Sequence, residues 1–272
     1  MEDQVQSHYA CPDLMDDIRA GLKKSGKDLT KLTPRDLAAV DQLHTGGGPA
    51  TLSLANRAGI TNDMDVLDAG CGLGGSSRLL AQNFNCRVTG IDLAPDFIET
   101  ARVLTQWCKM DITFEQGSIL SLPHDDDSFD MVLCQHILMN IEDKTRALAQ
   151  FSRVLRPGGK LILHEIVDGP GPAPLMPVPW AANPDISFLL TWKDLRAELK
   201  YRKFDLDYFS DETENSAQWW KKINKFTAKS PVRPLNSSLV FGSSAAHFGP
   251  NMENNFSSRA VCCIEAVLSK PA

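Results

Sequence analysis

Short apolar runs and stretches of helical spacing alternate through the middle of this chain. The run at residues 129–134 is nearly all apolar, as is typical of a strand that is covered on both faces of a sheet. Strands alternating with helices at this spacing predict an α/β fold, with a mostly parallel sheet and helices on both faces. The predicted strands lie at residues 65–68, 87–92, 112–115, 129–134 and 160–165, and the predicted helices at residues 76–83, 95–109 and 143–155.

The first 60 residues are predicted to be helical and to form an N-terminal cap. Thr33 and Pro34 suit the N-cap and the first position of a helix that runs to about residue 42. A shorter helix follows the glycine-rich turn after residue 44, and Gly59 is expected to end it.

A proline-rich segment at residues 168–184 interrupts the alternation. Proline is disfavoured in helix interiors and central strands, so we expect neither element here. Because ordered segments flank it, we expect a structured cap, inserted at about residues 168–190 of a single domain that spans residues 61–272.

The C-terminal part is predicted to contain two helices, at residues 191–202 and 213–229, and a final strand at residues 258–268. In the second helix, Trp219, Ile223 and Phe226 share one face, which we expect to be buried in the core.

Composition and charge narrow the classes of partner. The chain has 272 residues, 43% of them hydrophobic, and a formal net charge of −6. Proteins that bind phosphate backbones normally carry a basic surplus, so nucleic acid is not expected as a substrate. No apolar run approaches the roughly 20 residues of a membrane-spanning helix. Seven cysteines with no regular spacing favour reduced thiols, and hence a cytoplasmic protein. We expect no membrane attachment, and either a monomer or a homodimer.

The strongest chemical signal is a glycine-rich turn between the first predicted strand and its helix. Gly70 and Gly72 allow a ligand to approach the backbone closely. Asp68 precedes the turn, where a carboxylate would repel a pyrophosphate but attract a cationic amino acid. Asp92 ends the next strand, where an acid can accept both hydroxyls of a ribose. Together these residues predict a site for S-adenosylmethionine.

Other interpretations of these residues exist. Such a turn also occurs in NAD-dependent oxidoreductases, which would explain Asp92 but not Asp68. Asp92 could instead cap the following helix, and Cys71 is expected to contribute its backbone rather than act as a nucleophile. A non-catalytic nucleotide-binding module is a third alternative.

Four segments resemble the motifs of class I (type 11) S-adenosylmethionine-dependent methyltransferases in order and spacing. They are VLDAGCGLGGSSRLLA, GIDL, SFDMVLCQHILMNI and LRPGGKLIL, within about residues 60–165. The resemblance implies a Rossmann-like, seven-stranded sheet and an enzyme of class EC 2.1.1. The residues that it places at the cofactor are Asp68, Gly70, Cys71, Gly72, Asp92, Leu93, Ser118, Ile119 and Gln135. Ser118 stands where the family often has an aspartate.

A narrower resemblance, carried by HYACPDL, DQLHTGGGPAT, MNIEDK and PVPWA, points to the small-molecule subgroup that includes sarcosine and dimethylglycine N-methyltransferases. It implies a small acceptor, either an amine or amino acid methylated on nitrogen, or a quinol, sterol or polyketide-like molecule methylated on oxygen or carbon. Tyr9 is a candidate to fold over the cofactor, and Trp180 to form an aromatic wall that contacts the acceptor.

Methyl transfer needs a base only for a protonated amine or a hydroxyl acceptor. The expected candidates are His136, His44 and Glu165, with His164 next to the last of them. His136 is favoured because it follows the fourth predicted strand, at the edge of the sheet where open α/β folds bind ligands. No metal site is expected.

Overall fold

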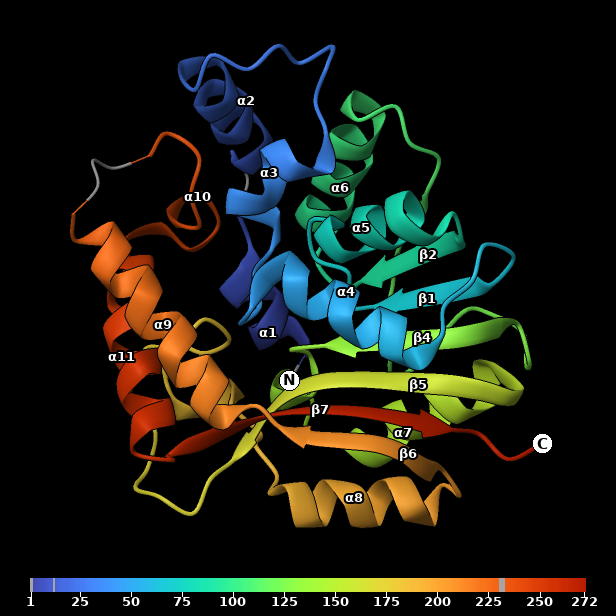
Figure 1. Cartoon of the computed structure of the whole chain (residues 1–272). Helices are drawn as coiled ribbons and strands as arrows, with labels where there is room; N and C mark the ends of the chain where they lie inside the picture. Colours follow the sequence, from blue (N-terminus) through green and yellow to red (C-terminus); the bar gives the residue numbers. More distant parts are fainter. Residues whose placement is uncertain (1, 12, 230–232) are drawn as a thin grey trace.

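The computed structural model describes residues 2–11, 13–229 and 233–272, and centres on one seven-stranded sheet (Figure 1). The strand order is β3-β2-β1-β4-β5-β7-β6, in which β7 runs antiparallel to both of its neighbours and the other pairs are parallel. The predicted Rossmann-like α/β sheet is confirmed. The strands are β1 (Asp65–Ala69), β2 (Arg87–Asp92), β3 (Thr113–Gln116), β4 (Phe129–Gln135), β5 (Leu155–Asp168), β6 (Asp205–Asp211) and β7 (Val261–Ser269).

Helices cover both faces of the sheet, as predicted. On one face, α4 (Gly47–Ala58) and α5 (Gly75–Phe84) place Leu54 and Leu80 against β1, β2 and β4. On the other face, α7 (Lys144–Val154) and α8 (Trp192–Tyr201) place Phe151 and Leu199 against β4, β5 and β7. The remaining core helix, α6 (Pro95–Trp107), lies beside β2 and β3.

Local capping chemistry sets the ends of the N-terminal helices. Here α1 (Glu2–Tyr9) and α2 (Leu14–Lys24) precede α3 (Pro34–Asp41), which starts with Pro34 after a Thr33–Asp36 capping box. Helix α4 ends at Gly59 with φ of 79°, the left-handed conformation that glycine adopts at little cost. Both predicted helix boundaries are confirmed.

The proline-rich segment is an ordered cap, as expected. It contains one short 3₁₀ helix, η2 (Pro184–Ile186), and an isolated bridge between Val178 and Ala181. Trp180 and Ile186 are buried against Met252 and Phe256 of α11 (Ala245–Ser257). The division into an N-terminal cap and one methyltransferase-sized domain stays a prediction.

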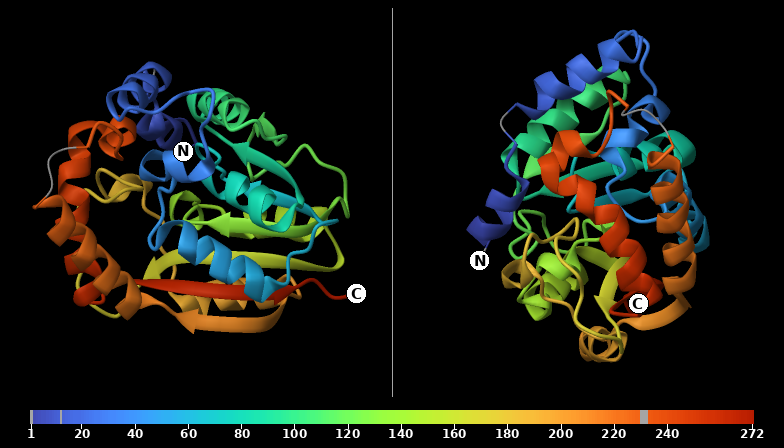
Figure 2. Two further views of the ribbon diagram at one scale, coloured as in Figure 1. Left: turned by 45° about the horizontal axis from the view of Figure 1, so that its top comes forward. Right: turned by 90° about the vertical axis from the view of Figure 1, so that its left-hand side faces the viewer.

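One burial prediction is wrong. Helix α9 (Thr213–Thr227) leaves Trp219 half-buried and exposes Ile223 and Phe226, whose exposed fractions are 36% and 47%. The helix instead buries its small polar residues Thr213 and Ser216, since Thr213 Oγ1 accepts the backbone hydrogen bond of Cys263 in β7. Helices α9 and α11 lie side by side at the carboxyl ends of the parallel strands (Figures 1 and 2).

Several elements differ from, or are missing in, the sequence-based prediction. Strand β5 starts at Leu155, so it includes the Pro-Gly-Gly stretch that was expected to precede it. Edge strand β6 and helix α11 were not assigned, and neither were the short α10 (Ser238–Phe241), η1 (Leu138–Asn140) and η3 (Gly242–Ser244).

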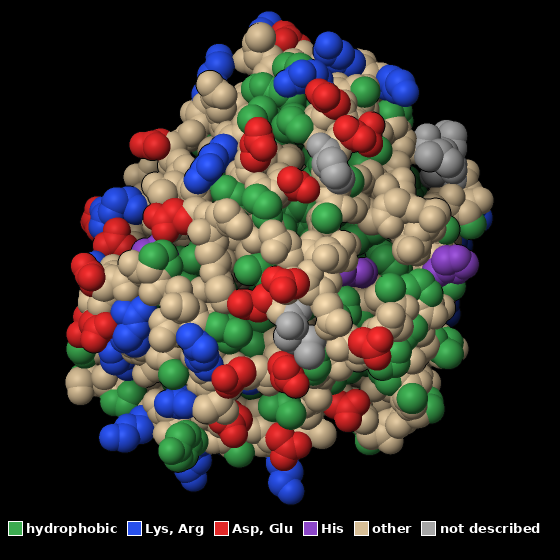
Figure 3. Space-filling model, turned by 180° about the vertical axis from the view of Figure 1, so that it is seen from behind, with side chains coloured by type: hydrophobic (Ala, Val, Ile, Leu, Met, Phe, Trp, Pro, Cys, Tyr) green, Lys and Arg blue, Asp and Glu red, His purple; other side chains and the backbone are tan. Residues whose placement is uncertain are grey.

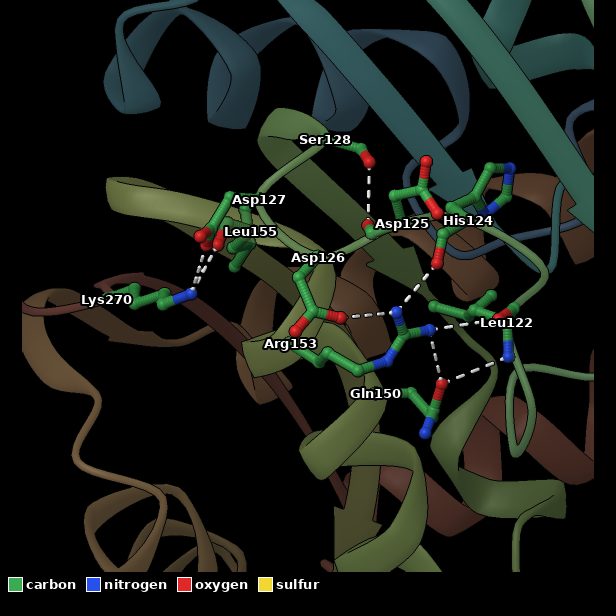
Figure 4. Close-up of polar contacts among 10 residues, drawn as sticks. All are labelled: Leu122, His124, Asp125, Asp126, Asp127, Ser128, Gln150, Arg153, Leu155 and Lys270. Carbon is green, nitrogen blue, oxygen red and sulfur yellow. Dashed lines mark hydrogen bonds and ion pairs between the residues drawn. The ribbon is translucent and has the colours of Figure 1, made fainter.

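Polar contacts fix the connection between β3 and β4 on the side away from the glycine turn (Figure 4). Arg153 of α7 donates to the carbonyl oxygens of His124 and Leu122 at 2.7 and 2.9 Å. Lys270, after β7, contacts Asp127 at 2.8 Å.

Viewed from behind, the surface mixes both signs of charge. Acidic side chains are scattered over the middle of this face, and Lys and Arg lie mainly near its upper and lower left edges (Figure 3). Among the described residues, no helix has the length and apolar character needed to cross a membrane.

Candidate active site

A cavity lies at the carboxyl ends of β1, β2 and β4, where open α/β sheets bind ligands. Its wall combines the glycine turn, the loops after β2, β3 and β4, helix α1 and the proline-rich cap. The predicted site residues that line it are Asp68, Gly70, Cys71, Gly72, Asp92, Leu93, Ser118, Ile119, Gln135, His44, His136, Tyr9 and Trp180.

The two glycines of the turn have different roles. Gly70 has φ of 79°, and a Cβ there would lie 2.2 Å from Cδ1 of Ile137, so the absence of a side chain leaves room for the Ile137 side chain. Gly72 has φ of 53°, and a Cβ there would meet no atom within 4 Å. Gly72 is therefore where the open backbone faces the cavity, and the expected close approach of a ligand applies to Gly72 rather than to Gly70.

Asp92 faces the cavity from the end of β2. One carboxylate oxygen accepts from the Gly72 N–H at 2.8 Å and the other from the Ala94 N–H at 3.0 Å. Burial raises the pKa of Asp92, and these two backbone donors oppose that shift. The carboxylate thus holds the glycine turn against β2 and keeps lone pairs for a ligand.

Asp68 lies at the end of β1 and is 2% exposed. Its Oδ2 accepts from Ser77 Oγ at 2.5 Å. Burial raises the pKa of Asp68 to about 6, so the group is largely ionised at neutral pH. A buried carboxylate with one neutral partner is suited to a cationic ligand group.

Helix α1 closes the cavity next to Ser118 and Ile119. Ser118 Oγ donates to the Glu2 carboxylate and accepts from the Leu120 N–H at 3.0 Å. Tyr9, at the end of α1, donates to Asn140 Oδ1 at 3.0 Å, and burial raises the pKa of its hydroxyl. Asn140 in turn donates to the carbonyl oxygens of Trp180 and Ile186 at 2.8 and 2.9 Å. Asn140 therefore joins the N-terminal helix to the proline-rich cap.

Gln135 is the centre of a buried polar network. Its Oε1 accepts from Ser76 Oγ at 2.8 Å and from Thr51 Oγ1 at 3.0 Å, while its Nε2 lies 2.8 Å from His164 Nδ1. Since the Thr51 proton goes to Gln135, His44 Nε2, 3.0 Å from Thr51 Oγ1, is the donor in that pair. The wall around Gln135 is thus fixed before a ligand binds.

Three imidazoles gather beside this network. The ring centroids of His136 and His164 are 4.7 Å apart, and the His44 ring centroid lies 6.1 Å from that of His136 and 5.9 Å from that of His164. Burial lowers the pKa of His44 to about 4 and that of His164 to about 3. Burial, and to a smaller extent the neighbouring imidazoles of His164 and His44, lower the pKa of His136 well below its ordinary value. All three side chains are neutral at physiological pH.

His136 is unusual in two respects. Its φ of 55° is rare for a residue with a side chain. Its Nε2 is buried and has no hydrogen-bond partner among the described residues. An unpaired buried nitrogen costs free energy, and a bound ligand would recover it.

Glu165 does not line the cavity. It is fully buried behind the wall, where it accepts from the N–H groups of Ile137 and Leu138 at 3.0 and 3.1 Å and from the Cys134 thiol at 3.2 Å. Burial raises the pKa of Glu165 to about 7. Its contacts give it a structural role, and the expectation that it acts as a base on the acceptor is not supported.

Sequence reasoning missed a buried ion pair under the turn. Arg78 of α5 contacts Asp41 at the end of α3 at 2.8 Å, and both side chains are almost fully buried. The only indication in the sequence is a charged residue among the apolar positions of the glycine-turn helix.

Trp220 was also missed. It lines the cavity and donates to Thr45 Oγ1 at 3.1 Å, but only its neighbour Trp219 belongs to the predicted apolar face of that helix.

The charge of the cavity wall is one-sided. Among the described residues its lining contains no Lys and no Arg, whereas Glu2, Asp41, Asp68, Asp92, Glu142 and Asp143 all contribute. Trp180, Trp220, Phe241, Met139 and Met252 supply an apolar part. The cavity thus favours ligands that are cationic or neutral and partly apolar.

Comparisons with known proteins agree with this geometry. Residues 67–163 match the model of a methyltransferase domain family. Phosphoethanolamine N-methyltransferase 1 of Zea mays is 30% identical over 127 residues, which are 47% of this chain and 25% of that protein. The first curated relatives match over between a quarter and about half of their own lengths.

Solved structures share the fold. The [4+2]-cyclase SpnF superimposes with a TM-score of 0.72 at 17% identity, over 100% of this chain and 97% of its own. Phosphoethanolamine N-methyltransferase 2 of Haemonchus contortus, solved in complex with S-adenosyl-L-methionine, has a TM-score of 0.69 at 20% identity, over 88% of this chain and 58% of its own.

Proposed function

We propose that this protein transfers a methyl group from S-adenosylmethionine to a small acceptor molecule, because residues 67–163 match the model of a methyltransferase domain family. One observation carries the proposal: Asp68 and Asp92 face a single cavity on either side of the open backbone at Gly72. Asp92 would bind the ribose hydroxyls and Asp68 the cationic amino acid part of the cofactor.

The same pair of carboxylates counts against a nicotinamide dinucleotide. A pyrophosphate next to the turn would lie close to the buried Asp68 carboxylate, and the wall supplies no Lys or Arg from its described residues to offset the repulsion. None of the comparisons supports the oxidoreductase alternative.

The chemistry of the wall bears on the acceptor. Phosphate groups are usually bound by Arg, Lys or helix N-termini. Among the described residues, the lining contains no Arg and no Lys. We therefore infer that the acceptor carries no phosphate and is neutral or cationic, with an apolar part that contacts Trp180 and Trp220. This differs from the substrate named for the maize relative.

The sulfonium of the cofactor supplies an already electrophilic methyl group. The contribution of the chain is to orient the acceptor and to exclude water, and orientation of this kind accounts for roughly 7–11 kcal/mol in model reactions. His136, neutral and facing the cavity, is the residue best placed to accept a proton from an acceptor, and His44 is the second candidate. A cytoplasmic location and a monomeric or homodimeric state stay predictions from the sequence.

A methyl-transfer assay tests the proposal. The full chain is incubated with methyl-labelled S-adenosylmethionine and matched acceptors, namely amines, quinols and phenols with and without a phosphate group. Label should enter unphosphorylated acceptors and depend on Asp92. Transfer to phosphorylated acceptors alone would refute the acceptor class, and cofactor binding without any transfer would favour the non-catalytic alternative.

A further inference from the structure

We propose that His136, His164 and Cys263 form a binding site for a divalent transition metal of the zinc type. Within the described residues, one potential ligand atom from each of the three lies within 4.8 Å of the other two. No metal site is expected from the sequence, because the cysteine is far from both histidines along the chain and the spacing matches no zinc motif.

The sheet brings the three residues together. His136 directly follows β4, His164 lies in β5 and Cys263 in β7, and these three strands are consecutive neighbours. The backbone N–H of His136 donates to the carbonyl of His164 at 2.8 Å. Cys263 pairs with Ile166, two residues after His164, so His164 and Cys263 project from the same face of the sheet. The site is thus built on rigid elements.

The distances suit a chelate. His164 Nε2 lies 3.3 Å from Cys263 Sγ. Zinc bonds of about 2.0 Å to nitrogen and 2.3 Å to sulfur, at the tetrahedral angle, place the two ligand atoms about 3.5 Å apart. His136 offers the third ligand, with its ligand atom within 4.8 Å of the other two. Its buried, unpartnered Nε2 is a nitrogen that nothing in the described part of the protein satisfies.

A bound cation would fix the protonation of its ligands. Zinc binds cysteine as the thiolate, and the charge of a bound divalent cation would stabilise the Cys263 thiolate. A metal on Nε2 of His164 would leave the proton on Nδ1, so the Gln135 amide, whose Nε2 lies 2.8 Å from Nδ1, would have to turn its oxygen toward that nitrogen to act as an outer partner.

The fourth position of such a site would face the substrate. His136 lines the cavity, whereas His164 and Cys263 lie behind its wall. With its Nε2 on the metal, His136 would no longer accept a proton there, and that role would pass to His44. A three-ligand site with one open position is typical of zinc that contacts a substrate rather than of structural zinc. This consequence rests on the proposed function; the metal site itself does not.

Cobalt(II) is a direct probe, because its bond to a thiolate gives a charge-transfer band in the near ultraviolet. Titrating the full wild-type chain with Co²⁺ should produce this band at one ion per chain, and Zn²⁺ should abolish it. Cys263→Ser should remove the band, whereas Cys262→Ser, the adjacent cysteine in the opposite core cluster of the sheet, should keep it. His164→Gln should weaken Co²⁺ binding at least about tenfold, and His124→Gln, beside Glu115, should leave it unchanged.

Two results would overturn the metal site. One is a wild-type chain that shows no thiolate band and retains no cobalt after dialysis. The other is a band that persists in Cys263→Ser, which would assign it to another thiol. Because serine is nearly isosteric with cysteine, and because the wild-type result stands alone, the test does not depend on the folding of the histidine variants. None of these measurements uses methyl transfer, so failure of the metal site and failure of the proposed function are distinguishable.

Discussion

Each oxygen of the Asp92 carboxylate already accepts one backbone hydrogen, from Gly72 and from Ala94. The residue therefore positions the turn that approaches the cofactor and also offers charged acceptors to its ribose. Asp92 therefore does more than cap the helix that follows it, because both segments that its carboxylate joins line the cavity.

Replacing Asp92 by Ala should weaken binding of S-adenosylhomocysteine at least about tenfold, since each lost charge-assisted bond is worth on the order of 1.5–3 kcal/mol. Isothermal titration calorimetry measures the change. Asp111→Ala, at an exposed position, is the control. Asp92→Asn, which keeps the size but not the charge, should fall between the two, and an unchanged dissociation constant in Asp92→Ala would rule out the ribose role.

Asp68 predicts a pH dependence of cofactor affinity. Burial raises its pKa to about 6, and only the ionised form attracts the ammonium group of the ligand's amino acid part. Affinity for S-adenosylhomocysteine should therefore rise between about pH 5 and about pH 7 and then level off. Asp68→Asn should bind more weakly and with a flatter profile. If calorimetry gives parallel profiles for both proteins, Asp68 does not titrate in the complex as proposed.

Between elements, the Arg78–Asp41 pair fixes helix α3 onto the helix behind the glycine turn. Arg78 also donates to the Leu73 carbonyl at 2.6 Å and to Thr105 Oγ1 at 2.7 Å. Arg78→Met should lower the free energy of unfolding by about 3–5 kcal/mol, because it leaves Asp41 buried without a counter-ion. Urea denaturation tests this, with exposed Arg35→Met as the control. Equal stability of Arg78→Met and wild type would show that the pair is dispensable.

Glu165 links β5 to the loop after β4, and its effect on stability should depend on pH. Burial raises its pKa from 4.5 to about 7, so the folded state binds this proton more tightly than the unfolded state. Stability from this group is consequently greatest at low pH and declines as the pH rises between those two values.

Glu165→Gln should remove that decline. Relative to wild type, the variant should gain up to about 3 kcal/mol in the free energy of unfolding on going from about pH 4.5 to about pH 8. Denaturation of both proteins at both pH values measures it, with the exposed Glu99→Gln as a control. A Glu165→Gln variant that keeps the wild-type slope would contradict the assignment.

The pattern of apolar residues predicted the elements in which the apolar positions are the buried ones. It failed where polar residues determine the packing. Strands β1 and β4 are mostly buried, β2 buries Val88, Gly90 and Ile91, and all three were found within one residue. Edge strand β6 alternates exposed and half-buried positions and carries Asp205, Asp207 and Asp211, so it lacks the signal of a buried strand. Helix α11 has Pro250 inside it, and α9 docks through Thr213 and Ser216 rather than through its aromatic stripe.

Across the whole molecule, the sheet order explains why residues so distant in sequence share a site. Parallel strands β1, β2 and β4 place Asp68, Asp92 and His136 at one edge, which sequence reasoning anticipated. It could not anticipate how antiparallel β7 brings Cys263 to His164, because that register depends on tertiary pairing. The N-terminal helix and the proline-rich cap, joined through Asn140, complete the cavity from distant parts of the chain.

The most direct test of the central claim is calorimetric titration of the full chain with S-adenosylhomocysteine and, separately, with NAD⁺. We predict that S-adenosylhomocysteine binds at one site per chain, that Asp92→Ala weakens this binding at least about tenfold, and that NAD⁺ produces no binding heat. Binding of NAD⁺ with no heat from S-adenosylhomocysteine would contradict the account.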